Sequence, residues 1–399
     1  MPLLSSSTPA RAPGSTLHAD RHRGSRHRGR VALAAAAAAA LALVGASGPA
    51  VADDGQKGHH DHAFQQVNLV SDLPGLAQLR DPDVVNPWGI DFGPTTPLWV
   101  SNQGSSTLTL YRGATTAAPT VVKVPLVIKA NSPTGMLFNP TKKFVIEQGG
   151  KKAPANFLMN ENLPPDNPAT GQVTAWSNAS APPPPTTTVV KATADRGTYA
   201  GLALIPATRK HGPRLLAVND GAGRIDVYDG KFHLRHLGKK AFVDPRAAAD
   251  GVVPYNAAYL HGRVYVSYFG ESSSALSVFR TDGRFVRRLA TGGPLVAPWG
   301  MTIAPKHWGA FGGALLVGNV GDGKINAFNP RNGHFLGTLK DAKGAPLVNV
   351  GLWGLKFGNG VLGNPSTLIF AAGIGETPTD FEHFYEHGLI GAITPVDDK

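Results

Sequence analysis

The chain has 399 residues, a formal net charge of +11, 48 glycines, 33 prolines and no cysteine. A cysteine nucleophile and a disulfide framework are therefore excluded. Residues 1–52 hold six Arg and one Asp, which leaves 32 basic against 26 acidic residues in the remainder. These charges are scattered and not interleaved with aromatic residues, so we expect no nucleic-acid partner. The chain also lacks a G-x-S-x-G motif and a phosphate-binding glycine loop.

The first 52 residues have the pattern of a secretory signal peptide. A basic block, "RHRGSRHRGR", precedes a run of 14 apolar residues and an A-x-A site before Asp53. An uncleaved anchor helix is the alternative, although the run is short for a bilayer. We expect the mature protein to be secreted and monomeric, with no transmembrane segment after cleavage.

Residues 53–63 are expected to form a flexible leader. The leader contains "GHHDH" (58–62), three His and one Asp that can bind Zn or Cu weakly. A disordered polar tail is the simpler interpretation. Residues 64–396 are expected to form one domain.

An internal repeat runs through this domain. The stretch that begins "NPWGIDFG" at Asn86 returns as "APWGMTIAP" at Ala297. Units of about 40 to 60 residues begin near residues 86, 132, 198, 253, 297 and 351. Four-stranded units at this period predict an all-β, six-bladed β-propeller. Two β-sandwich domains are the competing architecture, but no linker divides the repeats.

Short β-strand patterns bounded by Gly, Pro, Asn and Ser fill each unit. The first unit reads "WGIDFG", "PLWVSNQ", "STLTLYRG" and an outer "TVVKVPLVI"; the second reads "SPTGMLFNP", "ANFLMNE" and "GQVTAWS". The sixth ends after three strands, whereas residues 64–72, "FQQVNLVSD", form a strand pattern outside any complete unit. We therefore expect this N-terminal strand to close the last blade; a free N-terminal arm is the alternative.

The strands "GRIDVYD" and "GKINAFNP", each following a Pro-x-Gly or similar turn and two strands, resemble the NHL repeat family. The chain from "FQQVNLVSDLPG" through "NPWGI" to "HGLIGAITPV" also resembles a family of exported bacterial proteins of unassigned function. Both resemblances imply a propeller. Neither implies an activity, because propellers host enzymes, binding modules and scaffolds alike.

Aligning the units gives two rings of candidate site residues. The first ring, at the start of strand one, is Trp88, Thr134, Ala200, Tyr255, Trp299 and Trp353. The second ring, at the end of strand two, is Asn102, Asn160, Asn219, Tyr268, Asn319 and Gly373. Antiparallel pairing of these strands should bring both rings to one channel mouth.

The Trp, Tyr and Asn members of these rings are the candidate ligand-binding residues. Aromatic faces and oriented amides suit a small molecule, a glycan or a peptide. Alternatively, the Trp residues wedge between blades and the Asn residues cap turns. We therefore predict a binding or scaffolding module, with a purely structural envelope protein as one alternative.

The other alternative is a metal-dependent hydrolase or lyase at the same mouth. A lactonase-type propeller resembles this scaffold and needs a divalent cation held by oxygen ligands. Beside the second ring, only Glu161 and Asp220 offer carboxylates for Ca²⁺. Lyase or copper chemistry on NHL-like propellers needs several inward His, and the His residues here do not repeat in phase.

The stretch "HFYEH" (383–387) matches the H-x-x-E-H motif of inverted zinc proteases. That chemistry needs both His on one face of a helix. Here the stretch falls between the second and third strands of the sixth unit, so we expect a solvated loop. A metal ion held by Glu382, His383 and His387 is the alternative.

Overall fold

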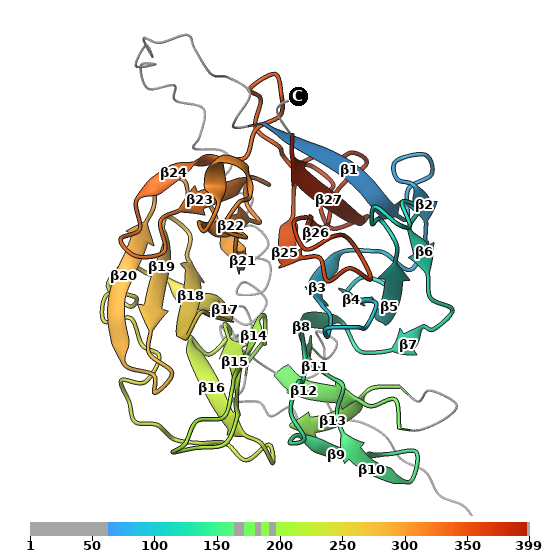
Figure 1. Ribbon diagram of the computed structural model, residues 1–399. Helices are drawn as coiled ribbons and strands as arrows, with labels where there is room; N and C mark the ends of the chain where they lie inside the picture. The colour runs from blue at the N-terminus through green and yellow to red at the C-terminus, as the bar shows by residue number, and fades with distance from the viewer. Residues whose placement is uncertain (1–62, 163–170, 180–184, 191–196, 397–399) are drawn as a thin grey trace, which may run out of the picture.

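The computed structural model describes residues 63–162, 171–179, 185–190 and 197–396. The expected signal peptide and residues 53–62 of the expected leader lie outside this part of the chain. As predicted, the described chain is an all-β, six-bladed β-propeller (Figure 1). Among the described residues, no helix is long and apolar enough to cross a membrane.

The first three blades follow the chain in order. Blade one consists of β3 (Pro87–Asp91), β4 (Leu98–Asn102), β5 (Thr107–Arg112) and two short outer strands that pair with β5, β6 (Val122–Lys123) and β7 (Ile128–Lys129). Blade two consists of β8 (Pro133–Phe138), β11 (Phe157–Asn162), β12 (Gly171–Trp176) and β13 (Thr187–Val190). Blade three consists of β14 (Leu202–Ile205), β15 (Arg214–Asn219) and β16 (Arg224–Asp229).

The last three blades complete the ring. Blade four consists of β17 (Val253–Leu260), β18 (Arg263–Phe269), β19 (Ser274–Phe279) and β20 (Phe285–Thr291). Blade five consists of β21 (Pro298–Ile303), β22 (Leu315–Asn319), β23 (Ile325–Phe328) and β24 (Phe335–Thr338), with a 3₁₀ helix, η1 (Gly309–Phe311), between its first two strands. Blade six consists of β25 (Leu352–Phe357), β26 (Leu368–Ala372), β27 (Leu389–Pro395), β1 (Phe64–Ser71) and β2 (Leu79–Arg80).

The N-terminal strand closes the last blade, as predicted from the sequence. Strand β1 pairs antiparallel with β27 from Phe64 opposite Pro395 to Ser71 opposite Leu389, with an irregularity between Asn68 and Val70 (Figure 1). Backbone hydrogen bonds therefore join the two ends of the domain and satisfy the edge of β27.

A hairpin in blade two was not predicted. Strands β9 (Val145–Gln148) and β10 (Lys151–Pro154) form a two-stranded hairpin inside the connection between the first two strands of blade two. Its two-residue turn has Gly149 and Gly150 at positive φ, 56° and 75°. Positive φ at both positions is the geometry of a type I′ turn.

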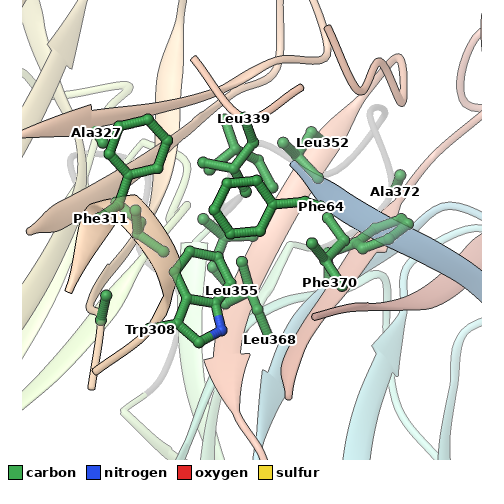
Figure 2. Close-up of a cluster of buried hydrophobic side chains, with 14 of the residues drawn as sticks. Phe64, Trp308, Phe311, Ala327, Leu339, Leu352, Leu355, Leu368, Phe370 and Ala372 are labelled. Carbon is green, nitrogen blue, oxygen red and sulfur yellow. The ribbon is translucent and has the colours of Figure 1, made fainter. Parts of the chain in front are cut away.

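Hydrophobic packing between blades supplies the core. Six clusters of buried side chains each join two neighbouring blades around the ring. Figure 2 shows the cluster between blades five and six, into which β1 inserts Phe64. Its ring lies 4.7 Å from that of Trp308 and stacks on Phe311 at 5.8 Å. The closing strand is thus held by packing as well as by its backbone pairing.

Glycine in the first strand lets neighbouring blades approach closely at the axis. A Cβ on Gly89 would lie 2.5 Å from the backbone nitrogen of Met136 and 2.6 Å from the carbonyl oxygen of Thr134. A Cβ on Gly135 would lie 2.8 Å from the carbonyl oxygen of Ala200. Blade four has Asn256 at this position instead, and its Nδ2 donates to the Trp299 carbonyl at 2.7 Å.

We predict that Phe64→Ala lowers the free energy of unfolding by about 3–5 kcal/mol, because a buried Phe leaves a cavity when truncated. Chemical denaturation of both proteins measures the difference. Val67→Ala, on the same strand but 37% exposed, is the control and should change stability little. Equal losses in the two variants would show that the aromatic contacts do not secure β1.

We predict that Gly89→Ala destabilises the protein by about 2 kcal/mol or more, because the new methyl group meets rigid backbone of the next blade. Gly212→Ala is the matched control, since a Cβ there meets no atom within 4 Å and its φ is not positive. Thermal melting compares the two. A melting temperature that falls no further in Gly89→Ala than in Gly212→Ala would contradict the close approach.

Candidate functional site

A cavity of about 750 Å³ runs along the propeller axis. Its wall is the first strand of each blade, mainly aliphatic side chains and glycine backbone. It also contacts the connections that follow these strands, at Pro140, Pro206, His261 and Lys306. The cavity therefore opens on the face that carries the connections between strands one and two. This is the face opposite the rings of Trp and Asn.

An ion pair spans two blades in the cavity wall. Lys356 Nζ of blade six lies 2.6 Å from Asp91 Oδ1 of blade one. The other carboxylate oxygen, Asp91 Oδ2, accepts a hydrogen bond from the Phe138 backbone N–H of blade two at 2.8 Å. The Lys356 ammonium is also 6.0 Å from the centroid of the Phe92 ring. The pair places fixed, opposite charges beside an otherwise mainly apolar wall.

Aromatic residues also line the cavity. Phe138, Tyr259 and Phe357 are half-buried and contribute to the lining. Asn256 and Thr302 add polar groups. A cavity with aromatic faces and a few polar groups can bind a ligand that presents both apolar and hydrogen-bonding surfaces.

The aromatic members of the first ring do come together. Trp88 stacks on Trp353 with ring centroids 3.5 Å apart, and Trp299 meets both edge-on at 6.2 and 5.8 Å. The ring centroid of Tyr255 lies 6.1 Å from that of Trp353, and the Tyr385 ring stacks on Trp353 at 5.5 Å. These rings pack on one another across the axis, and Trp299 also lines the cavity. Trp299 is thus the residue of this cluster that reaches the inner end of the cavity.

Asp220 lies beside this aromatic cluster. Thr198 Oγ1 donates a hydrogen bond to its carboxylate at 3.1 Å. Burial raises the pKa of Asp220 to about 7 despite this bond. The pKa of Tyr255 is raised by burial and further by the nearby Tyr385 and Asp220. A carboxyl group that titrates near neutrality is suited to proton transfer, and its protonated form suits this apolar setting.

The asparagines of the second ring are fully buried. Asn102 Nδ2 donates to Thr109 Oγ1 at 2.9 Å, within its own blade. Asn160 Nδ2 donates to the Gly201 carbonyl at 2.8 Å, across to the next blade. Asn219 and Asn319 donate to Asp226 and to the Pro294 carbonyl. Tyr268 is buried between blades three and four. Ligand binding by these residues remains a prediction.

The two acids proposed as cation ligands lie in different settings. Glu161 is buried in blade two, where Thr174 and Thr186 each donate to its Oε1 at 2.8 Å. Burial raises its pKa, and these hydrogen bonds oppose the shift. Asp220 lies instead in blade three beside the aromatic cluster. Among the described residues, no group of three or more His, Cys, Asp or Glu side chains is arranged to hold a metal ion.

The "HFYEH" stretch lies in the connection between β26 and β27, as expected. His383 Nδ1 is 3.1 Å from Asp380 Oδ2, and this contact raises the His383 pKa. His387 Nδ1 is 2.7 Å from Asp72 Oδ2. Partial burial opposes protonation of His387, but Asp72 and Glu376 outweigh it and raise the pKa. Each His is thus paired with a carboxylate, and the His387 pair ties this connection to the segment after β1.

Sequence comparison places the chain in a family with viral members. It is 30% identical over 305 residues to "Uncharacterized protein R648" of Acanthamoeba polyphaga mimivirus, with 72% of each chain covered. It is 29% identical over 312 residues to "Uncharacterized protein L690" of the same virus, covering 73% of this chain and 79% of that one. The chain therefore belongs to the family of these mimivirus proteins. No family model matches it.

A solved structure with the same fold is a glucose dehydrogenase. It aligns with a TM-score of 0.50 at 11% identity, covering 84% of this chain and 100% of that one. At this identity the likeness shows the β-propeller fold alone. The resemblance to NHL repeats and to exported bacterial proteins stays a prediction from sequence.

We predict that stability falls between pH 4 and pH 8 in part because Asp220 must lose its proton. Its pKa is raised in the folded protein, so the stabilisation is complete below pH 3.8 and is lost as pH rises through about 7. The full shift corresponds to at most about 4 kcal/mol. Asp220→Asn keeps the acceptor for Thr198 and should flatten this part of the profile.

Chemical denaturation of the wild-type protein and Asp220→Asn across this pH range gives the difference between their free energies of unfolding. The contributions of the histidines, which both proteins share, cancel in this difference. Parallel profiles for the wild-type protein and Asp220→Asn would contradict the raised pKa.

Proposed function

We propose that this protein is a binding module that takes a sugar-sized ligand into its axial cavity. The observation that carries the proposal is the cavity itself, about 750 Å³ in volume and lined by residues from the first strands of the blades. Such a volume suits a small molecule or one to a few sugar units. We also propose, from the pattern of residues 1–52, that the protein is exported.

The lining supports a carbohydrate more than a purely apolar ligand. Tyr259, Phe138 and Phe357 line the cavity, and each also packs against an interblade cluster. Their remaining exposed surface suits contact with the C–H surface of a sugar ring. The Asp91–Lys356 pair can donate to and accept from hydroxyl groups without being desolvated as a lone charge. In this proposal the tightly packed Trp cluster is the floor of the site and also stabilises the packing around the axis.

The test is calorimetric titration of the purified protein with neutral and acidic mono- and disaccharides, including glucose, galactose and galacturonate. We expect at least one to bind, and we expect Tyr259→Ala to weaken that binding about tenfold or more, because it removes one aromatic face of the cavity.

Arg287→Ala, an exposed residue of the outer strand β20, is the control and should bind as the wild-type protein does. Failure of every saccharide to bind, or equal binding by the wild-type protein and Tyr259→Ala, would overturn the proposal.

A further inference from the structure

The face onto which the cavity opens carries a concentration of basic residues. In a propeller with alternating strands, the connections between strands one and two and between strands three and four lie on one face. On blades two and three these connections hold seven exposed basic residues: Lys231 and six that are here called the basic patch, Lys142, Lys143, Lys151, Lys152, Arg209 and Lys210. Within the described chain, only Lys152 of this set forms an ion pair, an exposed one with Glu147.

The patch is presented by a firmly anchored element. The segment leading into and along β9 buries Phe144, Ile146 and Gln148, while the intervening residues point to solvent. Phe144 and Ile146 pack in the cluster between blades two and three. Gln148 Nε2 donates to the Pro185 carbonyl at 2.7 Å and to Thr187 Oγ1 at 2.9 Å. The hairpin therefore holds its exposed side chains on a fixed support.

The connections that carry the basic residues of the two blades lie close together. The backbone N–H of Phe144 donates to the Gly230 carbonyl at 2.8 Å. A Cβ on Gly230 would lie 2.9 Å from Lys143 Cβ and 3.6 Å from Pro213, which follows the connection that holds Arg209 and Lys210. The same two connections reach the cavity at Pro140 and Pro206. The patch and the cavity mouth are thus adjacent parts of one face.

The opposite face carries acidic as well as basic residues. There the connection between β26 and β27 carries Glu376, Asp380, Glu382 and Glu386. The segment after β1 adds Asp72, Asp81 and Asp83. Five of these seven carboxylates are ion-paired, with Lys123, His383 or His387. The basic patch differs from this face in offering unpaired cations that a polyanion can bind.

We propose that the basic patch binds an acidic polysaccharide, one whose sugar units carry carboxylate groups. The choice of a polysaccharide rests on the proposed function, because the patch borders a sugar-sized cavity; the choice of an anion rests on the charges alone. Lys142, Lys143 and Lys151 form no ion pair within the described chain, so they can bind negative charges without first breaking one; Lys152 would have to exchange its exposed pair with Glu147. The hairpin thus adds affinity for the polymer to the binding of a single unit.

Other polyanions fit this surface less well. Phe144 and Phe232, the aromatic residues beside the basic patch, are not exposed, so they offer no platform for stacking nucleic-acid bases. Val145 and Leu234 are the exposed large hydrophobic residues near it, too few to form an apolar wedge into a lipid bilayer. Duplex DNA and anionic vesicles therefore serve as competing outcomes.

The experiment measures binding of immobilised polygalacturonate by the wild-type protein at several salt concentrations. A variant with Lys142, Lys143, Lys151 and Lys152 all changed to Gln should bind at least tenfold more weakly, and its affinity should depend less steeply on salt. The matched control changes four exposed lysines of the opposite face, Lys239, Lys240, Lys340 and Lys343, to Gln and should bind as the wild-type protein does. Neutral dextran should bind no more tightly to the wild-type protein than to the Lys142, Lys143, Lys151 and Lys152 variant.

Three results would overturn the proposal: no binding of polygalacturonate, equal losses in the two four-lysine variants, or tighter binding of duplex DNA or phosphatidylserine vesicles. The Tyr259→Ala variant separates this proposal from the previous one. If it loses monosaccharide binding but still binds the polymer, both stand. If the wild-type protein binds the polymer through the patch but no monosaccharide, only the cavity proposal fails. If monosaccharides bind and the polymer does not, only the patch proposal fails.

Discussion

The close approach of neighbouring first strands around the axis is the constraint on which the remaining architecture depends. At Gly89 and Gly135 the next blade's backbone occupies the space that a side chain would fill. The Gly135 N–H donates to the Ala200 carbonyl at 2.8 Å, so this approach is also a hydrogen-bonded contact. Drawing the first strands together at one level fixes the radius of the ring. The interblade clusters then fill the wedge-shaped space farther out.

This constraint also shapes the candidate site. At the level of the glycines the channel is narrow, and the adjacent Trp88, Trp299 and Trp353 fill it with stacked rings. Beyond the glycines the first strands diverge and leave the axial cavity. One end is therefore a packed aromatic floor, and the other is an open mouth. The main role of the tryptophans is packing. Trp299 belongs both to the tryptophan cluster and to the cavity lining, so a ligand in the cavity would contact it.

The sequence predicted the fold and the meeting of the aromatic ring, because repeated glycines, turns and strand patterns encode blades locally. It did not predict the cavity that opens on the opposite face. The motifs "WGIDFG" and "WGLKFG" place Asp91 and Lys356 three residues after the ring Trp, and only the structure shows that they pair across blades. The hairpin had a readable signal, "VIEQGGKKAP", with a Gly-Gly turn between two short strands. The hydrogen-bond partners of the buried side chains were harder to predict. Asn102 and Asn160 occupy equivalent positions in their blades but donate to different partners.

The connections on the two faces of the propeller differ in how much they contribute to packing and ring closure. The aromatic end is completed by buried contacts, such as the hydrogen bond from Trp353 Nε1 to Asn86 Oδ1 at 3.0 Å, and by ties to the closing strand. Changes there disturb packing and ring closure. The connections at the cavity mouth lie outside the paired strands, so they can lengthen without changing the ring. Blade two shows this freedom: its connection folds back as β9–β10 and packs one side against the core. Insertions are therefore easiest to accommodate at this end.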